Sequence, residues 1–277
     1  MKIKVFTAFS GYDSQCLALE RLKRDYPEFD YELVGWAEID KYAIQAHNAL
    51  FPEATDKNYG DISKINWDEV PDFDLFTYSS PCQDFSNAGK QMGGEEGSGT
   101  RSSLLWECRR AIVAKRPKYL LLENVKALVS KKFLPLFNKW QEELEGYGYA
   151  TFAKVLNAKD YGVPQNRERI FLFSIRHDGE NVNYHFPLPF PLELRLKDVL
   201  EEHVDEKYYL SDETIKNFEA HLQRNKENGN GFGWKPTEGR GVANTVLAGT
   251  ERPSDNYIKE DDDLDSRGVV EVEWKTI

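Results

Sequence analysis

The chain has 277 residues and a formal net charge of −11, with 40% hydrophobic and 13% aromatic residues. This content supports a folded core and excludes intrinsic disorder, and the length allows one large domain or two modest ones. No apolar run approaches the ~20 residues of a membrane helix, and the acidic charge argues against a nonspecific polyanion binder, although a local basic face can still bind nucleic acid.

The N-terminal sequence and the spacing of the cysteines indicate in which cellular compartment the protein is located. MKIKVFTAF starts directly with a strand pattern and has no small-residue cleavage site, so we expect no signal peptide. Cys16, Cys82 and Cys108 are odd in number and widely spaced, which fits neither a disulfide framework nor a metal site. The sequence therefore predicts a reducing, cytoplasmic location, with no metal and no membrane association.

Strand and helix patterns alternate through the first 176 residues. Strands are expected at 2–9, 31–38, 72–79, 118–125, 150–156 and 169–175. Helices are expected at 16–24, 40–50, 102–116 and 131–148, the last interrupted early by Pro135. This alternation predicts an α/β fold with a mostly parallel sheet, in which ligands bind at the carboxyl ends of the strands.

The pattern changes near residue 180. A proline-rich segment at 185–196 is typical of a linker, so we predict one domain at 1–182 and a second at 183–277. The second domain has one expected helix, at 211–224, and a locally basic stretch between 215 and 252 that includes a Gly-rich region.

Cys82 follows an expected strand within the stretch SSPCQDFSNAG. A free cysteine is often only a small buried residue, and we prefer that interpretation for Cys16 and Cys108 on apolar helix faces. Cys82 differs because it stands where a strand leaves the sheet and precedes loop-forming residues. Its position alone leaves a buried structural residue and a nucleophile equally open.

Glu123 ends the most apolar strand of the chain, and in a parallel sheet it would share an edge with Cys82. It is either a polar strand end in solvent or a proton donor. Arg167 and Arg169 are two residues apart and would project to one side of an extended segment. Two guanidinium groups suit an anionic ligand or an ion pair with a carboxylate, and a surface salt bridge is the alternative.

The early turn FSGYDSQ precedes two acidic residues, Glu38 and Asp61. A strand, a turn and a helix followed by an acidic strand end resemble a nucleoside-binding layout, in which the carboxylate accepts hydrogen bonds from ribose hydroxyls. The turn has only one glycine, Gly11, whereas a pyrophosphate cradle usually needs more. A nucleoside-type cofactor without phosphates therefore fits better.

The order of these segments is more specific than any one of them. They read FSG, AEIDKYA, GDI, SPCQDFSNAGKQ, ENVK and YGVPQNRERI. In this order they resemble the DNA (cytosine-5)-methyltransferase family of bacterial and phage restriction–modification systems, in register from about residue 2 to 176 and more weakly through RGVANTVLAG at 240–249. The resemblance implies an S-adenosylmethionine-dependent methyltransferase fold, with a Rossmann-like, mostly parallel sheet and a small irregular recognition domain.

The resemblance also implies roles for single residues. Cys82 would add to C6 of a flipped-out cytosine, Glu123 would bind N3, and Arg169 would lie near the base carbonyl, with Arg167 nearby. Phe9 would contact the adenine of S-adenosylmethionine, Glu38 its ribose and Asp61 its amino group. The whole implied cofactor site comprises Phe9, Gly11, Glu38, Ile39, Asp61, Ile62, Pro81 and Leu104. Gln83 and Ser86 would belong to a loop that closes over double-stranded DNA.

Two other functions stay open at this point. One is a tRNA cytosine-5 methyltransferase with the same core, although the roughly 100 residues after residue 176 favour a DNA-recognition domain. The other is a subunit that binds DNA or cofactor without turnover. Candidate DNA contacts are Arg224, Lys235, Arg240 and Arg252, each explained equally well as solvated surface.

The sequence departs from the family pattern in two places. Asp13 and Ser14 occupy first-motif positions where the family usually has glycine, which predicts a wider turn. The helical segment and G-N-S-V-type motif that normally follow the recognition domain are not found before Ile277. We therefore expect a split enzyme completed by a second polypeptide, a truncation or a non-catalytic relic, and poor stability or activity of this chain alone.

Overall fold

The structure is a computed structural model that describes residues 2–81, 101–177, 179–201, 204–229, 237–238, 241–245, 257–259 and 269–271. The chain divides into two compact units. Unit 1 comprises Met1–Leu156 and Arg169–Phe186, and unit 2 comprises Asn157–Glu168 and Pro187–Ile277. The boundary between Phe186 and Pro187 therefore falls inside the proline-rich segment, and the segment 157–168 groups with the C-terminal unit.

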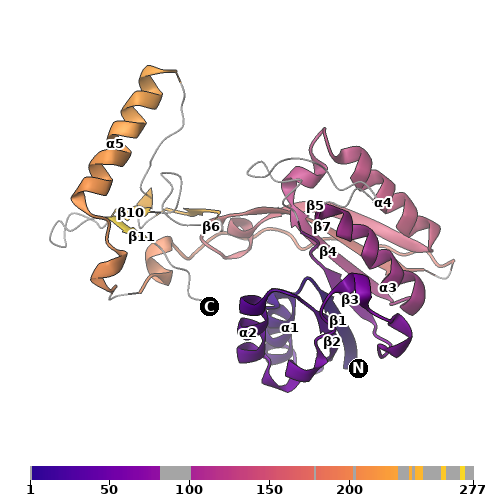
Figure 1. Ribbon diagram of the computed structural model, residues 1–277. Coiled ribbons are helices and arrows are strands. Elements are labelled where there is room, and N and C mark those ends of the chain that lie inside the picture. Colours follow the sequence, from indigo (N-terminus) through magenta and orange to yellow (C-terminus); the bar gives the residue numbers. More distant parts are fainter. Residues whose placement is uncertain are drawn as a thin grey trace. The chain divides into compact units, whose positions relative to one another are not determined.

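Unit 1 is built on one six-stranded sheet (Figure 1). Its strands are β1 (Lys2–Ala8), β2 (Asp30–Ala37), β3 (Leu75–Tyr78), β4 (Tyr119–Val125), β5 (Tyr149–Asn157) and β7 (Glu168–Arg176). Its α-helices are α1 (Ser14–Asp25), α2 (Lys41–Leu50), α3 (Cys108–Lys115) and α4 (Leu134–Gly146). Short 3-10 helices are η1 (Pro52–Lys57), η2 (Ile62–Lys64), η3 (Trp67–Glu69), η4 (Arg101–Glu107) and η5 (Lys126–Val129).

The strand order is β2-β1-β3-β4-β7-β5. β2, β1, β3 and β4 are parallel neighbours, whereas β7 runs antiparallel to β4. The predicted mostly parallel sheet is confirmed. β2 and β3 pair with opposite sides of β1, so the direction in which strands are added reverses there, and open α/β sheets bind ligands outside the carboxyl ends of their strands at such a point.

Two buried clusters cover the two faces of this sheet. Successive side chains of a strand point to opposite faces, and in β1 Val5 packs with Cys16 and Trp36, whereas Phe6 packs in the larger cluster with Trp140. Helices α1 and α2 contribute to the first cluster, and α3 and α4 to the second (Figure 1). The sheet is therefore a middle layer packed on both faces, and the loops lie at the ends of its strands.

The structure differs from the expected elements in two places. The helix expected at 102–116 is divided into η4 and α3, which begins at Cys108. Pro135 does not interrupt a helix, because α4 begins at Leu134. Pro135 thus lies in the first turn, where the N–H that proline lacks would have no helical partner.

Among the described residues of unit 2, the one long helix is α5 (Asp212–Glu227), whose N-cap Ser211 accepts a hydrogen bond from the Thr214 N–H at 3.2 Å. Its other elements are short: η6 (Ala158–Tyr161), β6 (Gln165–Asn166), η7 (Leu196–Val199), η8 (Glu206–Tyr208), β8 (Thr237–Glu238), β9 (Ala243–Asn244), β10 (Tyr257–Lys259) and β11 (Val269–Glu271). Their brevity agrees with the irregular character predicted for the C-terminal part.

Candidate active site

Predicted site residues gather at the edge of the unit 1 sheet that is formed by the carboxyl ends of its parallel strands. Phe9 follows β1, Glu38 follows β2, Pro81 comes after β3, and Glu123 lies near the end of β4. Because these four strands are parallel neighbours, their carboxyl ends meet at the same edge. The expectation that the strands leading to Cys82 and Glu123 are neighbours is confirmed.

The Glu38 carboxylate is fixed by backbone N–H groups. Oε2 accepts from the Gly11 N–H at 2.9 Å, and Oε1 accepts from the N–H groups of Ile39 and Asp40 at 2.8 and 2.9 Å. One carboxylate therefore joins the turn after β1 to the start of α2, whose N-cap is Asp40. A carboxylate oxygen can accept more than one hydrogen bond, so Glu38 keeps capacity for a ligand's hydroxyl groups.

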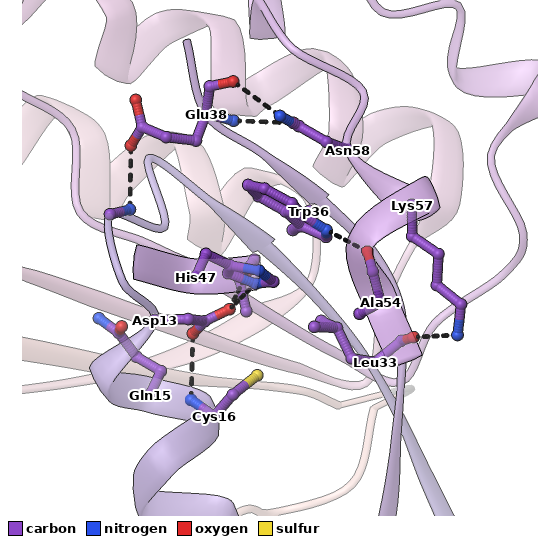
Figure 2. A network of polar contacts seen from close by, with 12 residues as sticks. Asp13, Gln15, Cys16, Leu33, Trp36, Glu38, His47, Ala54, Lys57 and Asn58 are labelled. Atoms are coloured by element: carbon purple, nitrogen blue, oxygen red, sulfur yellow. Dashed lines mark hydrogen bonds and ion pairs between the residues drawn. The ribbon is translucent and has the colours of Figure 1, made fainter. Parts of the chain in front are cut away.

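Asn58 was not predicted from the sequence, and it connects the loops that carry Glu38 and Asp61. Its Oδ1 accepts from the Glu38 N–H at 3.2 Å and its Nδ2 donates to the Glu38 carbonyl at 3.1 Å (Figure 2). The same Oδ1 also accepts from the Gly60 N–H at 2.9 Å. Asparagine in a loop is too common for its position in the sequence to reveal this role.

Asp61 is partly exposed and is the N-cap of η2. Its Oδ1 accepts from the Ser63 hydroxyl at 2.7 Å and from the Ser63 N–H at 3.0 Å, while Lys64 Nζ lies 3.6 Å from Oδ2. The Ser63 side chain is the main cause that holds the pKa of Asp61 below its ordinary value. Asp61 is thus an ionised acceptor at neutral pH.

Backbone next to these carboxylates leaves space for a ligand. Gly11 and Gly60 both have positive φ, at 58° and 70°, and a Cβ added to either would meet nothing within 4 Å. Phe9 also has positive φ, 54°, and packs against the larger core cluster while remaining partly exposed. A bulky residue held in the left-handed region is uncommon and indicates a constrained turn.

The apolar residues of the implied cofactor site differ in exposure. Ile39 is 72% exposed, whereas Ile62 is buried in the larger core cluster. Pro81 and Leu104 are partly buried, and Leu104 lies in η4. Ile39, Pro81 and Leu104 therefore keep some exposed surface, whereas the buried Ile62 anchors the loop that begins at Asp61.

Glu123 forms an ion pair with Arg169. The Arg169 Nε lies 3.1 Å from Glu123 Oε1, and both side chains are largely buried, with 17% and 24% exposed. β7 is antiparallel to β4, so Arg169 near its start is opposite Val125 at the end of β4. The pair combines a charged donor with a carboxylate at the edge that also carries Glu38.

Arg167 does not share an extended strand with Arg169, in contrast to the expectation from their spacing. β7 begins at Glu168, and Arg167 lies before it, in the segment that groups with unit 2. Within that segment the Arg167 N–H donates to Asn157 Oδ1 at 3.0 Å, and its carbonyl accepts from the Ala158 N–H at 3.1 Å. Two-residue spacing predicts a shared face only where the strand is continuous.

Asn124 anchors the backbone that leads to Cys82. It is 3% exposed, and its Nδ2 donates to the Ser80 carbonyl at 3.0 Å. Its Oδ1 accepts from the Val125 N–H at 2.9 Å. The side chain thus connects the end of β4 to the residues after β3, a role that was not predicted from the sequence.

The central residues of the proposed chemistry lie outside the described residues. These are Cys82, Gln83 and Ser86, together with Lys235, Arg240 and Arg252 among the candidate DNA contacts. Cys16 and Cys108 are free thiols with no exposed surface, as predicted. Burial raises the pKa of both, so neither resembles an activated nucleophile.

A doubly wound α/β sheet with acidic residues at its switch point defines a protein that binds a nucleoside-type cofactor. The comparisons identify the class more closely. A family model described as C-5 cytosine-specific DNA methylase matches residues 3–268. The chain therefore belongs to the C-5 cytosine-specific DNA methylase family, which confirms the predicted family, class of enzyme and S-adenosylmethionine as the cofactor class.

Several relatives are named methyltransferases. The type II methyltransferase M2.ScrFI of Lactococcus lactis subsp. cremoris is 39% identical over 264 residues, covering 77% of this chain and 71% of the relative. M.NlaX of Neisseria lactamica is 34% identical, covering 94% and 78%. The orphan methyltransferase M.Rho11sI of Bacillus phage rho11s is 34% identical over 82% of this chain, which spans only 49% of that relative.

Solved structures with low identity support the fold. The methyltransferase EhMeth of Entamoeba histolytica aligns with a TM-score of 0.67 at 15% identity, over 98% of this chain and 83% of that one. Dnmt2 of S. pombe aligns with a TM-score of 0.62 at 17% identity, over 88% and 70%. The predicted fold class is confirmed. No helix within the described ranges is both long and apolar enough to cross a membrane.

The residues present fit S-adenosylmethionine. Glu38 is an oriented carboxylate with remaining acceptor capacity, which suits hydroxyl groups such as those of a ribose, and Asp61 is an ionised acceptor, which suits an amino group. Gly11 and Gly60 leave backbone open beside both carboxylates. The single glycine of the turn between β1 and α1 matches a cofactor without a pyrophosphate.

Proposed function

We propose that this chain transfers a methyl group to C5 of cytosine in a specific DNA sequence. The observation that carries the proposal is the Glu123–Arg169 pair, 3.1 Å between Nε and Oε1, at the sheet edge that also presents Glu38. A cytosine ligand and a nucleoside cofactor ligand on one edge are what such a transfer needs. Type II and orphan methyltransferases among the relatives support a role in restriction–modification or in protecting host DNA.

At the base, Cys82 is the proposed nucleophile. Its thiolate adds to C6 of cytosine, a bond forms between Sγ and C6, and electron density moves to C5. Glu123 binds N3 and stabilises the charge that develops on the ring. Arg169 orients the Glu123 carboxylate and donates towards the base carbonyl. Once C5 has taken up the methyl group, loss of the C5 proton to a base lets the thiolate leave, which regenerates Cys82.

At the cofactor, Glu38 would hold the ribose hydroxyls and Asp61 the adenine amino group. Apolar contacts to the ring would come from the exposed or partly exposed members of the implied set, Phe9, Ile39, Pro81 and Leu104. S-adenosylmethionine, when bound, supplies the electrophilic methyl group that C5 takes up. Backbone donors fix Glu38 before binding, so little reorganisation accompanies it.

Cytosine within a stacked duplex cannot be approached at C6 from above the ring, so the proposal includes base flipping. Gln83 and Ser86 would belong to the loop that closes over the extruded base. The C-terminal unit would read the target sequence, and Arg224 on α5 is an exposed candidate for phosphate contact. A cytoplasmic location and a second polypeptide that completes the site stay predictions from the sequence.

A covalent trap tests the proposal. Fluorine at C5 cannot leave as a proton does, so 5-fluorocytosine holds the enzyme on the DNA after methyl transfer. Long mixed-sequence duplex containing 5-fluorocytosine, incubated with the chain and S-adenosylmethionine, should give an adduct stable to denaturing electrophoresis. Cys82→Ala should abolish it, and the matched control Cys108→Ala should retain it. An adduct that persists in Cys82→Ala would refute the assignment of the nucleophile.

A further inference from the structure

Asp13 stands where the sequence predicted a wider turn, and the turn is instead closed. The Asp13 N–H donates to the Ser10 carbonyl at 2.7 Å, and Asp13 itself adopts φ 67°. Glycine takes this left-handed conformation without cost, whereas aspartate takes it only where side-chain contacts compensate. The substitution of aspartate for glycine therefore requires an explanation in contacts.

The Asp13 carboxylate is fully buried and lies among elements on both sides of the turn. Oδ2 accepts from the Thr7 hydroxyl of β1 at 2.7 Å, and Oδ1 accepts from the Cys16 N–H at 3.0 Å, which caps α1. His47 Nε2 of α2 lies 3.5 Å from Oδ2. A buried carboxylate is tolerated only when hydrogen bonds replace water; the Thr7 hydroxyl and the Cys16 N–H supply them, and the His47 ring lies beside them.

His47 is also fully buried, and its ring is fixed in orientation. It stacks on Trp36 of β2 with ring centroids 3.6 Å apart and planes 14° apart, and Trp36 Nε1 donates to the Ala54 carbonyl at 2.8 Å (Figure 2). Neither ring nitrogen of His47 makes a hydrogen bond within the part of the chain that the structure describes. A proton on Nε2 would point to Asp13 Oδ2, which lies 3.5 Å away.

The contact between Asp13 and His47 joins the two segments whose backbone N–H groups hold the Glu38 carboxylate. Asp13 closes the turn whose Gly11 N–H donates to Glu38 Oε2, and His47 belongs to the helix whose N-cap follows Glu38 by two residues. The backbone donors that hold Glu38 thus come from both segments that the pair of Asp13 and His47 joins. A shift of either segment would move one donor relative to the other.

We propose that Asp13 and His47 form a buried positioning pair that holds the turn after β1 against α2 and thereby fixes Glu38 for cofactor binding. The pair replaces the conformational freedom of a glycine-rich turn by a specific contact. This inference rests on the proposed function, because it assigns Glu38 to the cofactor. Asp13 and His47 touch neither cofactor nor base, so their effect would act through Glu38.

Four variants separate positioning from general stability. Asp13→Asn keeps the left-handed conformation accessible and the acceptor for the Cys16 N–H, but it removes the charge that faces His47. His47→Phe keeps the stacking on Trp36 and removes both nitrogens, whereas His47→Gln can restore an N–H near Nε2. Tyr149→Phe is the matched control, because it removes one buried hydrogen bond, from Tyr149 Oη to the Pro117 carbonyl at 2.7 Å, far from Glu38 in the sequence.

Binding of S-adenosylhomocysteine by calorimetry is the readout, with thermal unfolding measured in parallel. We expect Asp13→Asn and His47→Phe each to weaken binding about 10-fold, the double variant to be no weaker than the worse single one, and His47→Gln to recover part of the loss. Tyr149→Phe should unfold earlier with unchanged affinity. If the affinities of the pair variants match wild type, or fall no more than that of Tyr149→Phe, the pair has no positioning role. If wild type itself does not bind, the proposed cofactor site fails instead.

Discussion

Removal of the Asn124 side chain should separate the stability of unit 1 from the geometry of its nucleophile. Asn124→Ala deletes the donor to the Ser80 carbonyl and the acceptor for the Val125 N–H, and both Asn124 and Ser80 are almost fully buried. Ser80 precedes Cys82 by two residues. The variant therefore loosens the point at which the chain leaves β3, next to the proposed nucleophile.

The size of the effect follows from these two contacts. A typical hydrogen bond contributes about 1 kcal/mol net, and a buried group left without a partner costs about 1–3 kcal/mol, so we expect a loss of roughly 2–4 kcal/mol in the free energy of unfolding. A misplacement of about 1 Å near a reacting group can cost about 100-fold in rate. In molecules that remain folded, adduct formation should therefore slow by about 10- to 100-fold.

Urea unfolding measures the first quantity, and single-turnover adduct formation on 5-fluorocytosine DNA measures the second. Ser80→Ala is the graded comparison, because it removes only the weaker contact from Asn124 Nδ2 to Ser80 Oγ at 3.4 Å and leaves the carbonyl contact intact. It should react nearly as fast as wild type. Wild-type adduct rates in a destabilised Asn124→Ala protein would refute the view that this side chain positions the residues before Cys82.

Three further outcomes are expected. Ser174 is fully buried, and its hydroxyl has no hydrogen-bond partner within the described residues, so Ser174→Ala should leave the free energy of unfolding unchanged or raise it by up to about 1 kcal/mol in urea titrations; a clear loss would reveal a partner. The Ser63 side chain holds the pKa of Asp61 below 3.8, so the stabilisation by Asp61 is present above that pH and is lost as pH falls through the lower folded pKa. Ser63→Ala should raise this pKa in carboxyl-carbon NMR titrations, and an unchanged value would contradict the assigned cause. Burial raises the thiol pKa values of Cys16 and Cys108, so brief alkylation of the native protein at pH 8 should leave both unmodified in peptide maps, and rapid labelling of either would contradict their burial.

Periodicity and residue order in the sequence predict most of the unit 1 sheet, because its strands are short apolar runs and its helices have one apolar face. The antiparallel direction of β7 is not encoded in its own residues, since an isolated strand pattern carries no direction. The same limit applies to the segment 157–168, whose β6 pairs with β9 across more than 70 residues of sequence, Gln165 with Ala243. Local patterns cannot report such long-range pairing.

The three acidic residues of the site show why some of its geometry is predictable and some is not. Asp61 is held mainly by Ser63, two residues away, and Glu38 takes two of its three donors from the next two residues. Such local capping follows from residue type and spacing. Glu123 instead faces Arg169, which reaches it only because β7 reverses direction beside β4. The groups assigned to the cofactor are therefore organised largely by their own loops, whereas the group assigned to the base depends on correct assembly of the sheet. Mutations that disturb the pairing of β4 with β7 should accordingly impair the steps at cytosine before they impair cofactor binding.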